Sequence, residues 1–248
     1  TLSNPLTTFG RMSIQFDFTG QVVLVAGASG DLGTAVVEQF QNAGATVCMS
    51  ARHPPEDGNA AELLENDMVH FYGADFTDEA AVKEVYNSII DDHGRLDAVC
   101  TVIGAWRGGT RLDQTPVDEF DFLMSVNLKT MFLAAKHAVP HLRESNGNLV
   151  SVSARSSLEG GEGDGPYRAA KAGVRLLTET IAEENLGSVR ANAVMPSIID
   201  TPANRDMLPD ADHDSWPTPE EIGREIAFLC SDASSATSGA AVPVYGEI

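Results

Sequence analysis

Basic side chains are scarce in this chain, and lysine is the scarcest of them. The 248 residues include 16 Lys and Arg against 36 Asp and Glu, which gives a formal net charge of −20. The only lysines are Lys83, Lys129, Lys136 and Lys171. A surface this acidic repels nucleic acid and anionic membranes, so neither is expected as a partner. Salt at 1 M screens charges beyond about 3 Å, and the acids are spread along the chain rather than gathered in a tail. We therefore expect a halophilic protein from a cytoplasm of high salt.

Cysteines and long apolar runs are also few. Cys48, Cys100 and Cys230 stand singly in apolar surroundings. An odd count without metal-ligand spacing indicates buried free thiols, so we expect neither a disulfide framework nor a metal site. No apolar run is long enough to span a bilayer, and residues 1–18 lack the charged start and apolar middle of a signal peptide. We interpret them as an N-terminal leader and expect a cytoplasmic protein in which residues 19–248 form a single domain.

A glycine-spaced turn between a strand and a helix is the strongest local pattern. Val22–Ala26 is an apolar run typical of a buried strand, Gly27, Gly30 and Gly33 follow it, and the sequence then becomes periodic like a helix. Small residues at such a turn let backbone N–H groups approach an anion, and the helix N-terminus adds partial positive charge. The pattern predicts a site for the pyrophosphate of a dinucleotide. An ordinary glycine-rich turn is the alternative.

Apolar runs and helical patterns alternate through the rest of the chain. This alternation predicts an α/β fold, a single Rossmann-type doubly wound parallel sheet of about seven strands with helices on both faces. Thr115 and Pro116 resemble an N-cap and first helical residue, opening a long helix to about His137, and Thr218 and Glu221 resemble a capping box. The remaining strands are expected over Thr46–Ser50, Met68–Tyr72, Leu96–Ile103, Asn148–Ser153, Val189–Val194 and Ala241–Val244, and the main helices over Asp78–Asp92, Pro166–Asn185 and from Pro219 to about Cys230.

Two residues four apart carry the predicted chemistry. Tyr167 and Lys171, in PYRAAKAG, fall on one face of a helix. An ammonium near a phenol favours the phenolate and lowers the pKa of the phenol from about 10 toward neutrality. With these residues the chain from about Thr19 to its C-terminus resembles the short-chain dehydrogenase/reductase family. The resemblance implies that Tyr167 passes a proton to or from the substrate, that Lys171 also holds the nicotinamide ribose, and that Asn127 supports a water connected to the lysine.

The resemblance also implies a coenzyme site. The family usually ends its second strand with an acid when it prefers NAD, whereas here Arg52 follows, and an arginine pairs with a 2′-phosphate. NADP(H) is therefore favoured over NAD(H). Asp75 matches the acid that contacts adenine, and Asp31 stands where the family has its middle glycine. The coenzyme-binding residues are expected to be Gly27, Ser29, Gly30, Asp31, Leu32, Gly33, Arg52, Asp75, Phe76, Ile103, Gly104, Lys171, Pro196, Ile198 and Ile199.

The catalytic serine of the family has no direct counterpart. Ala154, thirteen residues before Tyr167, occupies its place. Its neighbour Ser153 is our expected catalytic serine, Ser156 and Ser157 lie further along, and a site that works without a serine is the alternative.

The lost serine is shared with dihydropteridine-reductase-like members of the family, which the chain also resembles in IGAWRGG, SARSSLEG and the segment after PSIIDTP. We expect hydride transfer between the nicotinamide and a small substrate with a carbonyl, hydroxyl or imine group. Trp106, Arg107, Arg155 and Trp216 are candidate walls of its pocket. A non-catalytic NADP(H)-binding regulatory protein is the alternative function. By analogy with the family, we expect a dimer or tetramer.

Overall fold

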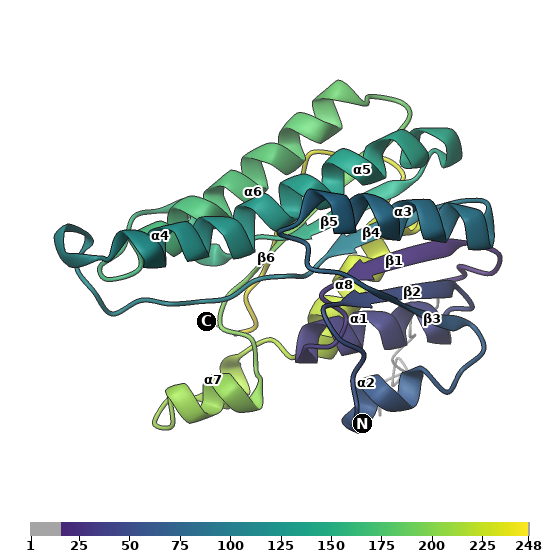
Figure 1. Ribbon diagram of the computed structural model, residues 1–248. Helices are drawn as coiled ribbons and strands as arrows, with labels where there is room; N and C mark the ends of the chain where they lie inside the picture. The colour runs from purple at the N-terminus through teal and green to yellow at the C-terminus, as the bar shows by residue number, and fades with distance from the viewer. Residues whose placement is uncertain (1–15, 248) are drawn as a thin grey trace, which may run out of the picture.

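A seven-stranded parallel sheet forms the centre of the molecule (Figure 1). The computed structural model describes residues 16–247. The strands lie in the order β3-β2-β1-β4-β5-β6-β7, and every neighbouring pair is parallel. This order confirms the predicted doubly wound α/β fold. The strands are β1 (Val22–Ala26), β2 (Thr46–Ala51), β3 (Val69–Gly73), β4 (Ala98–Thr101), β5 (Asn148–Val152), β6 (Arg190–Pro196) and β7 (Ala241–Val244).

Helices cover both faces of this sheet, because its central strands are apolar on both sides. Helices α1 (Asp31–Asn42) and α8 (Pro219–Cys230) pack together on one face. Helices α3 (Glu79–His93), α5 (Thr130–Ser145) and α6 (Gly165–Glu184) cover the other, where they share an apolar core with β1 and β4 (Figure 1). The shorter helices are α2 (Gly58–Leu63), α4 (Val117–Leu123) and α7 (Pro202–Met207).

The predicted capping box at the start of α8 is confirmed. The Thr218 hydroxyl accepts a hydrogen bond from the Glu221 backbone N–H at 3.3 Å, and the Glu221 carboxylate accepts one from the Thr218 N–H at 3.0 Å. Two N–H groups that the helix cannot satisfy internally are thereby paired.

The long helix expected after Thr115 differs at both ends. Its N-cap is Pro116, because the Thr115 hydroxyl donates instead to the Arg111 carbonyl oxygen at 3.1 Å. The helical path runs through α4, a π-helical turn over Met124–Lys129 and α5, past Pro140 as far as Ser145. An interior proline removes one N–H donor and commonly kinks or ends a helix, but α5 continues beyond Pro140. The helix ends where Asn146 adopts a left-handed conformation with φ of 53°, which an asparagine tolerates.

The packed domain begins before residue 19. Phe18 is fully buried, its ring lies 4.8 Å from that of Phe40, and its N–H donates to the Ala43 carbonyl oxygen at 2.8 Å. Aromatic burial therefore joins Phe18, the last residue of the proposed leader, to the core. Residues 1–15 of the proposed leader lie outside the described part of the chain.

The three cysteines are buried free thiols, as predicted. Over residues 16–247, no helix has the length and apolar character needed to cross a membrane.

The parallel register brings the carboxyl ends of the central strands to one edge. Ala26 at the end of β1 pairs with Ser50 and Thr101, and Thr101 pairs with Ser151. Ligands bind at this edge in open parallel sheets, where loops from neighbouring strands meet. The glycine turn, the residues after β4 and the residues after β5 all leave the sheet there.

Candidate active site

The glycine turn forms a cradle that side chains would fill. Gly27 has φ of 94°, in the left-handed region, and a β-carbon there would lie 2.9 Å from the Ile103 nitrogen. A β-carbon on Gly33 would collide with the Gly27 carbonyl oxygen, whereas one on Gly30 would meet open space. Gly27 and Gly33 therefore permit close backbone packing, and Gly30 leaves the outer side of the turn open.

The N-terminus of α1 offers backbone donors to an anion. Its N-cap is Gly30, and no side chain caps the first turn. Ser29 and Asp31 are exposed beside it, whereas Leu32 is buried beneath. Unpaired N–H groups and the helix dipole suit a pyrophosphate, and the residues present fit this part of a dinucleotide. The negative charge of the Asp31 carboxylate would repel the pyrophosphate.

Arg52 and Asp75 lie at the ends of β2 and β3. The Asp75 carboxylate accepts hydrogen bonds from the Thr77 N–H at 2.9 Å and the Thr77 hydroxyl at 2.8 Å. These bonds, with a smaller contribution from the nearby Arg52 charge, lower the pKa of Asp75. Arg52 is exposed. The Phe76 ring is buried, so its backbone is the part that remains available to a ligand.

Asn127 forms hydrogen bonds with the backbone of the loop that follows β4. It lies in the π-helical turn between α4 and α5 and is 1% exposed. Its side-chain oxygen accepts from the Ala105 N–H at 3.1 Å, and its amide donates to the Ala105 carbonyl oxygen at 2.9 Å. A β-carbon on Gly104 would lie 2.9 Å from both the Asn127 oxygen and Lys171 Nζ. The structure thus brings Asn127, Gly104 and Lys171 together.

Lys171 is a cation buried beneath the site. It is 4% exposed, and its Nζ donates to the Val152 carbonyl oxygen, at the end of β5, at 3.0 Å. Burial lowers the pKa of Lys171 to about 8, because removal from water disfavours the charged form. Lys171 Nζ lies 5.9 Å from the centre of the Tyr167 ring.

Tyr167 differs from the expectation in its acidity. Burial, followed by the negative charge of Asp164, raises the pKa of Tyr167 to about 12. The predicted shift toward neutrality is wrong for this arrangement, because Lys171 Nζ lies over the ring and donates to Val152 rather than to the phenol oxygen. The phenol therefore holds its proton at neutral pH.

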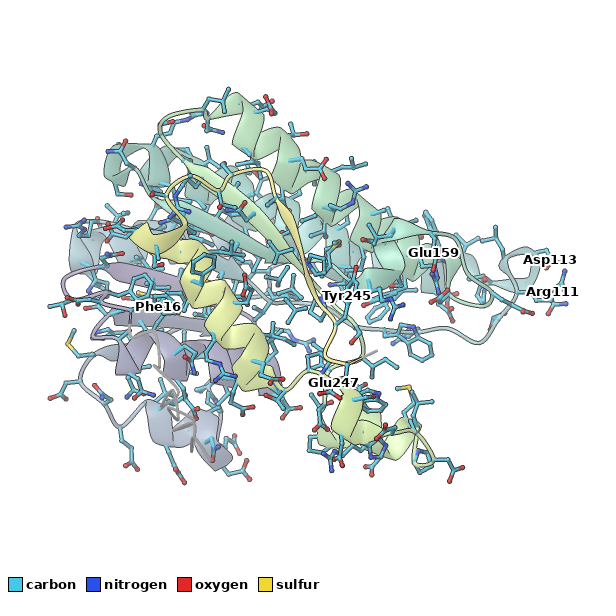
Figure 2. All side chains as sticks on the ribbon, turned by 180° about the vertical axis from the view of Figure 1, so that it is seen from behind. Phe16, Arg111, Asp113, Glu159, Tyr245 and Glu247 are labelled. Atoms are coloured by element: carbon cyan, nitrogen blue, oxygen red, sulfur yellow. The ribbon has the colours of Figure 1, made fainter. Side chains whose placement is uncertain are left out.

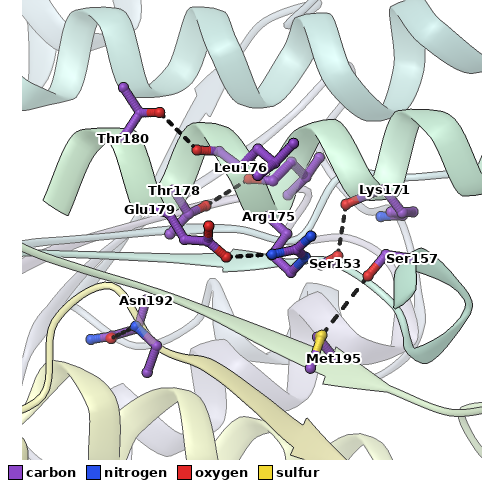
Figure 3. Close-up of polar contacts among 12 residues, drawn as sticks. Ser153, Ser157, Lys171, Arg175, Leu176, Thr178, Glu179, Thr180, Asn192 and Met195 are labelled. Atoms are coloured by element: carbon purple, nitrogen blue, oxygen red, sulfur yellow. Dashed lines mark hydrogen bonds and ion pairs between the residues drawn. The ribbon is translucent and has the colours of Figure 1, made fainter. Parts of the chain in front are cut away.

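The hydroxyl of Ser153 points to the backbone of α6 (Figure 3). It is 2% exposed and donates to the Lys171 backbone carbonyl oxygen at 2.8 Å. It therefore joins β5 to α6, and this position does not support direct contact with a substrate. Ser157 is also buried, with its hydroxyl 3.8 Å from the Met195 sulfur. Successive side chains of an extended segment point to opposite sides, so Ser153 and its neighbour Ala154 face different sides of the chain.

The remaining candidates divide between the site and the core. Pro196 ends β6 and is buried, and Ile198 and Ile199 follow it with part of their side chains accessible. Trp106 is 47% exposed in the loop after β4. Trp216 is 5% exposed, so it covers the core rather than lining an open pocket.

Two further candidate walls are arginines that lie over aromatic rings. The Arg107 guanidinium carbon lies 3.7 Å from the centre of the Phe122 ring, and that of Arg155 lies 5.0 Å from the Tyr245 ring. Tyr245 was not among the predicted site residues. No local pattern could have indicated it, since its chain segment reaches this edge only after β7.

Within residues 16–247, no group of three or more His, Cys, Asp and Glu side chains has the arrangement needed to hold a metal ion.

Comparisons with known proteins show which family the chain belongs to. Residues 26–246 match the family described as enoyl-(acyl carrier protein) reductase. The 3-oxoacyl-[acyl-carrier-protein] reductase FabG of Thermotoga maritima is 32% identical over 241 residues, covering 92% of this chain and 97% of that protein. Meso-2,3-butanediol dehydrogenase of Serratia marcescens is 29% identical over 239 residues, covering 92% and 94%.

A solved structure, ElxO with NADP bound, superposes with a TM-score of 0.83 at 25% identity, covering 91% of this chain and 97% of that one. The fold, the match over most of the chain and these relatives lead to one conclusion: the chain belongs to the short-chain dehydrogenase/reductase family of oxidoreductases.

Proposed function

We propose that this oxidoreductase uses NADP(H) and acts on a small substrate with a carbonyl, hydroxyl or imine group, with Tyr167 as proton donor and acceptor. The observation that carries the proposal is the placement of Tyr167 above the buried Lys171 ammonium, which is anchored to the Val152 carbonyl oxygen. This pair lies at the same edge of the sheet as the glycine cradle. A proton donor and a dinucleotide site therefore meet there.

Each residue at this edge has a separate proposed role in the reaction. When bound, the coenzyme supplies or accepts a hydride. The Tyr167 phenol, with a pKa of about 12, carries the proton that a substrate oxygen or nitrogen needs on reduction. Lys171, fixed by its hydrogen bond to the Val152 carbonyl oxygen, would hold the nicotinamide ribose, as the family resemblance implies. Asn127 holds the Ala105 backbone, and with it one side of the site, in place.

Replacing Tyr167 by Phe tests this role. Tyr167→Phe should lower kcat by roughly 100- to 10,000-fold, because the variant keeps the ring but has no proton to transfer. Turnover of a carbonyl and imine panel with NADPH at high salt is the assay, and NADPH affinity measured by fluorescence should stay within about twofold. A variant that retains the wild-type rate would exclude Tyr167 as the proton donor.

Arg52 is the proposed determinant of coenzyme choice. It is exposed at the end of β2, where its guanidinium can pair with a 2′-phosphate. Loss of such a charge-assisted contact costs about 1.5–3 kcal/mol, so Arg52→Asp should weaken NADPH binding by at least roughly tenfold and leave NADH binding nearly unchanged. Titration with both coenzymes is the measurement, and Arg111→Asp is the control for net charge. Equal losses for both coenzymes would remove Arg52 from this role.

A non-catalytic NADP(H)-binding regulatory protein remains the second candidate. Ala154, where the family has its serine, favours it. The Tyr167 phenol opposes it, because a proton-donating group held beside the Lys171 ammonium has no evident use in a protein that only binds coenzyme. The panel assay with NADPH separates the two functions.

Three finer features belong to the same proposal. The absent serine supports a place in the dihydropteridine-reductase-like subgroup, and the net charge of −20 supports a halophilic source with a cytoplasmic location. An apolar hollow lined by Met124, Leu128, Phe132 and Leu177 supports self-association as a dimer or tetramer, since Phe132 is half exposed there.

A further inference from the structure

Eight of the eleven arginines between residues 16 and 247 are held by hydrogen bonds or ion pairs within the chain. Six form ion pairs with carboxylates, namely Arg95, Arg111, Arg168, Arg175, Arg205 and Arg224. Arg143 donates to an amide oxygen, and Arg190 to backbone carbonyls. In the stretch from 16 to 247, Arg52, Arg107 and Arg155 form neither hydrogen bonds nor ion pairs. They follow β2, β4 and β5, so the uncompensated arginine charge gathers at the edge that carries the candidate site.

Arg155 has its donors free. It is exposed, in the first position of a short 3-10 helix over Arg155–Leu158. The Tyr245 ring lies 5.0 Å from its guanidinium carbon, and the Tyr245 carbonyl oxygen is itself held by the Ser197 hydroxyl at 2.8 Å. A contact with a ring face positions a guanidinium without using its N–H groups.

Arg155 lies close in the chain to the residue that positions Lys171. The Val152 carbonyl oxygen, three residues earlier, accepts the hydrogen bond from Lys171 Nζ. Ala154, directly before it, is buried and has no polar side chain to offer a substrate. Arg155 is therefore the first polar side chain after β5 that points to solvent rather than into the β5–α6 interface.

We propose that Arg155 determines substrate specificity by binding an anionic group of the substrate, a carboxylate or a phosphate. This inference rests on the proposed reductase function. A chain with a net charge of −20 repels anions in general, so an anionic substrate needs a local positive group, and an arginine binds both anions through two parallel hydrogen bonds. Tyr245 holds the guanidinium in place for this contact.

Matched pairs of carbonyl compounds test the proposal. Acetoacetate is compared with methyl acetoacetate, and dihydroxyacetone phosphate with dihydroxyacetone, using wild type, Arg155→Met and the control Arg111→Met at high salt. Arg111 carries the same charge but lies at the outer tip of the molecule, away from Tyr245 (Figure 2). We expect wild type to favour the anionic member of at least one pair. Arg155→Met should lower kcat/KM for that anion by roughly 10- to 100-fold more than kcat/KM for its neutral partner. The substrate pair whose kcat/KM changes in Arg155→Met shows whether Arg155 binds a carboxylate or a phosphate.

Binding measured without turnover separates this inference from the reductase proposal. The change in melting temperature caused by each anion is measured in the presence of NADPH for two proteins, the Tyr167→Phe variant and the double variant Tyr167→Phe, Arg155→Met. A thermal shift that depends on Arg155 would support the anion site. If the wild-type protein at the same time reduced none of the compounds, the proposed reductase function would be overturned. The anion site is overturned if neither anion binds, if Arg155→Met affects anion and neutral partner equally, or if Arg111→Met has the same effect.

Discussion

Lys171 and Tyr167 show at the scale of single residues how burial acts on opposite charges. Burial lowers the pKa of Lys171 to about 8 and raises that of Tyr167 to about 12, in each case by disfavouring the charged form. At neutral pH the site therefore holds a protonated phenol above an ammonium. In this state the phenol still carries its proton.

The buried ammonium should impose a measurable cost on stability. Between pH 8 and 10 the unfolded chain keeps the proton on Lys171 while the folded protein releases it, so this group makes the fold more stable as pH rises. Relative to Lys171→Met, wild type should gain about 2 kcal/mol in free energy of unfolding over that range. Denaturant unfolding of both proteins at pH 7, 8, 9 and 10 measures the difference. A difference independent of pH would show that Lys171 is not a buried cation.

At the scale of secondary structure, the loop after β4 depends on an irregular turn. The π-helical turn over Met124–Lys129 widens the helix where Asn127 bonds both backbone groups of Ala105. Turns of this kind often mark functional sites. A regular apolar period does not reveal one, so the sequence indicated only a helix here.

The first turn of α1 carries an acid where an anion is expected to bind. Asp31 stabilises the helix dipole but repels a pyrophosphate. Asp31→Asn should therefore tighten NADPH binding by roughly fivefold at low salt, an effect of about 1 kcal/mol, and by less at 2 M KCl, where the charge is screened. Coenzyme titration at both salt concentrations gives the result.

Asp118→Asn, in the first turn of α4, removes one acid far from the cradle and serves as the control for Asp31→Asn. If both variants tighten NADPH equally, the effect comes from net charge and not from the position of Asp31.

At the scale of the whole molecule, negative charge dominates the surface. The net charge of −20 leads to self-repulsion that favours expanded states. The ion pairs within the described residues involve only part of the acids.

Salt should accordingly stabilise the fold. We expect Tm to rise by roughly 10 °C between 0.1 and 2 M KCl, equivalent to a few kcal/mol for a chain of this size. The Tm of a variant with Gln in place of the exposed Glu56, Glu62 and Glu65 should rise less with KCl, because this variant has less negative charge for the salt to screen. Calorimetry on both proteins is the measurement. A Tm that does not respond to KCl would contradict the halophilic assignment.

The sequence by itself determined the order of strands and helices, the glycine cradle and the placement of Tyr167 and Lys171 on one helical face. Each of these depends on neighbours along the chain: apolar period, turn glycines and a spacing of four residues. The strand-end position of Arg52 was predictable for the same reason.

Only the tertiary structure decided where the side chains point and how they ionise. Ser153 faces α6 because of the strand pleat and the Lys171 carbonyl oxygen, and the pKa of Tyr167 rises because other segments bury it. The helix passes Pro140 because its packing continues to Leu142, and Arg155 meets Tyr245 across the sheet edge. Direction, burial and contacts between distant segments arise from packing, and packing is not encoded in any short stretch of sequence.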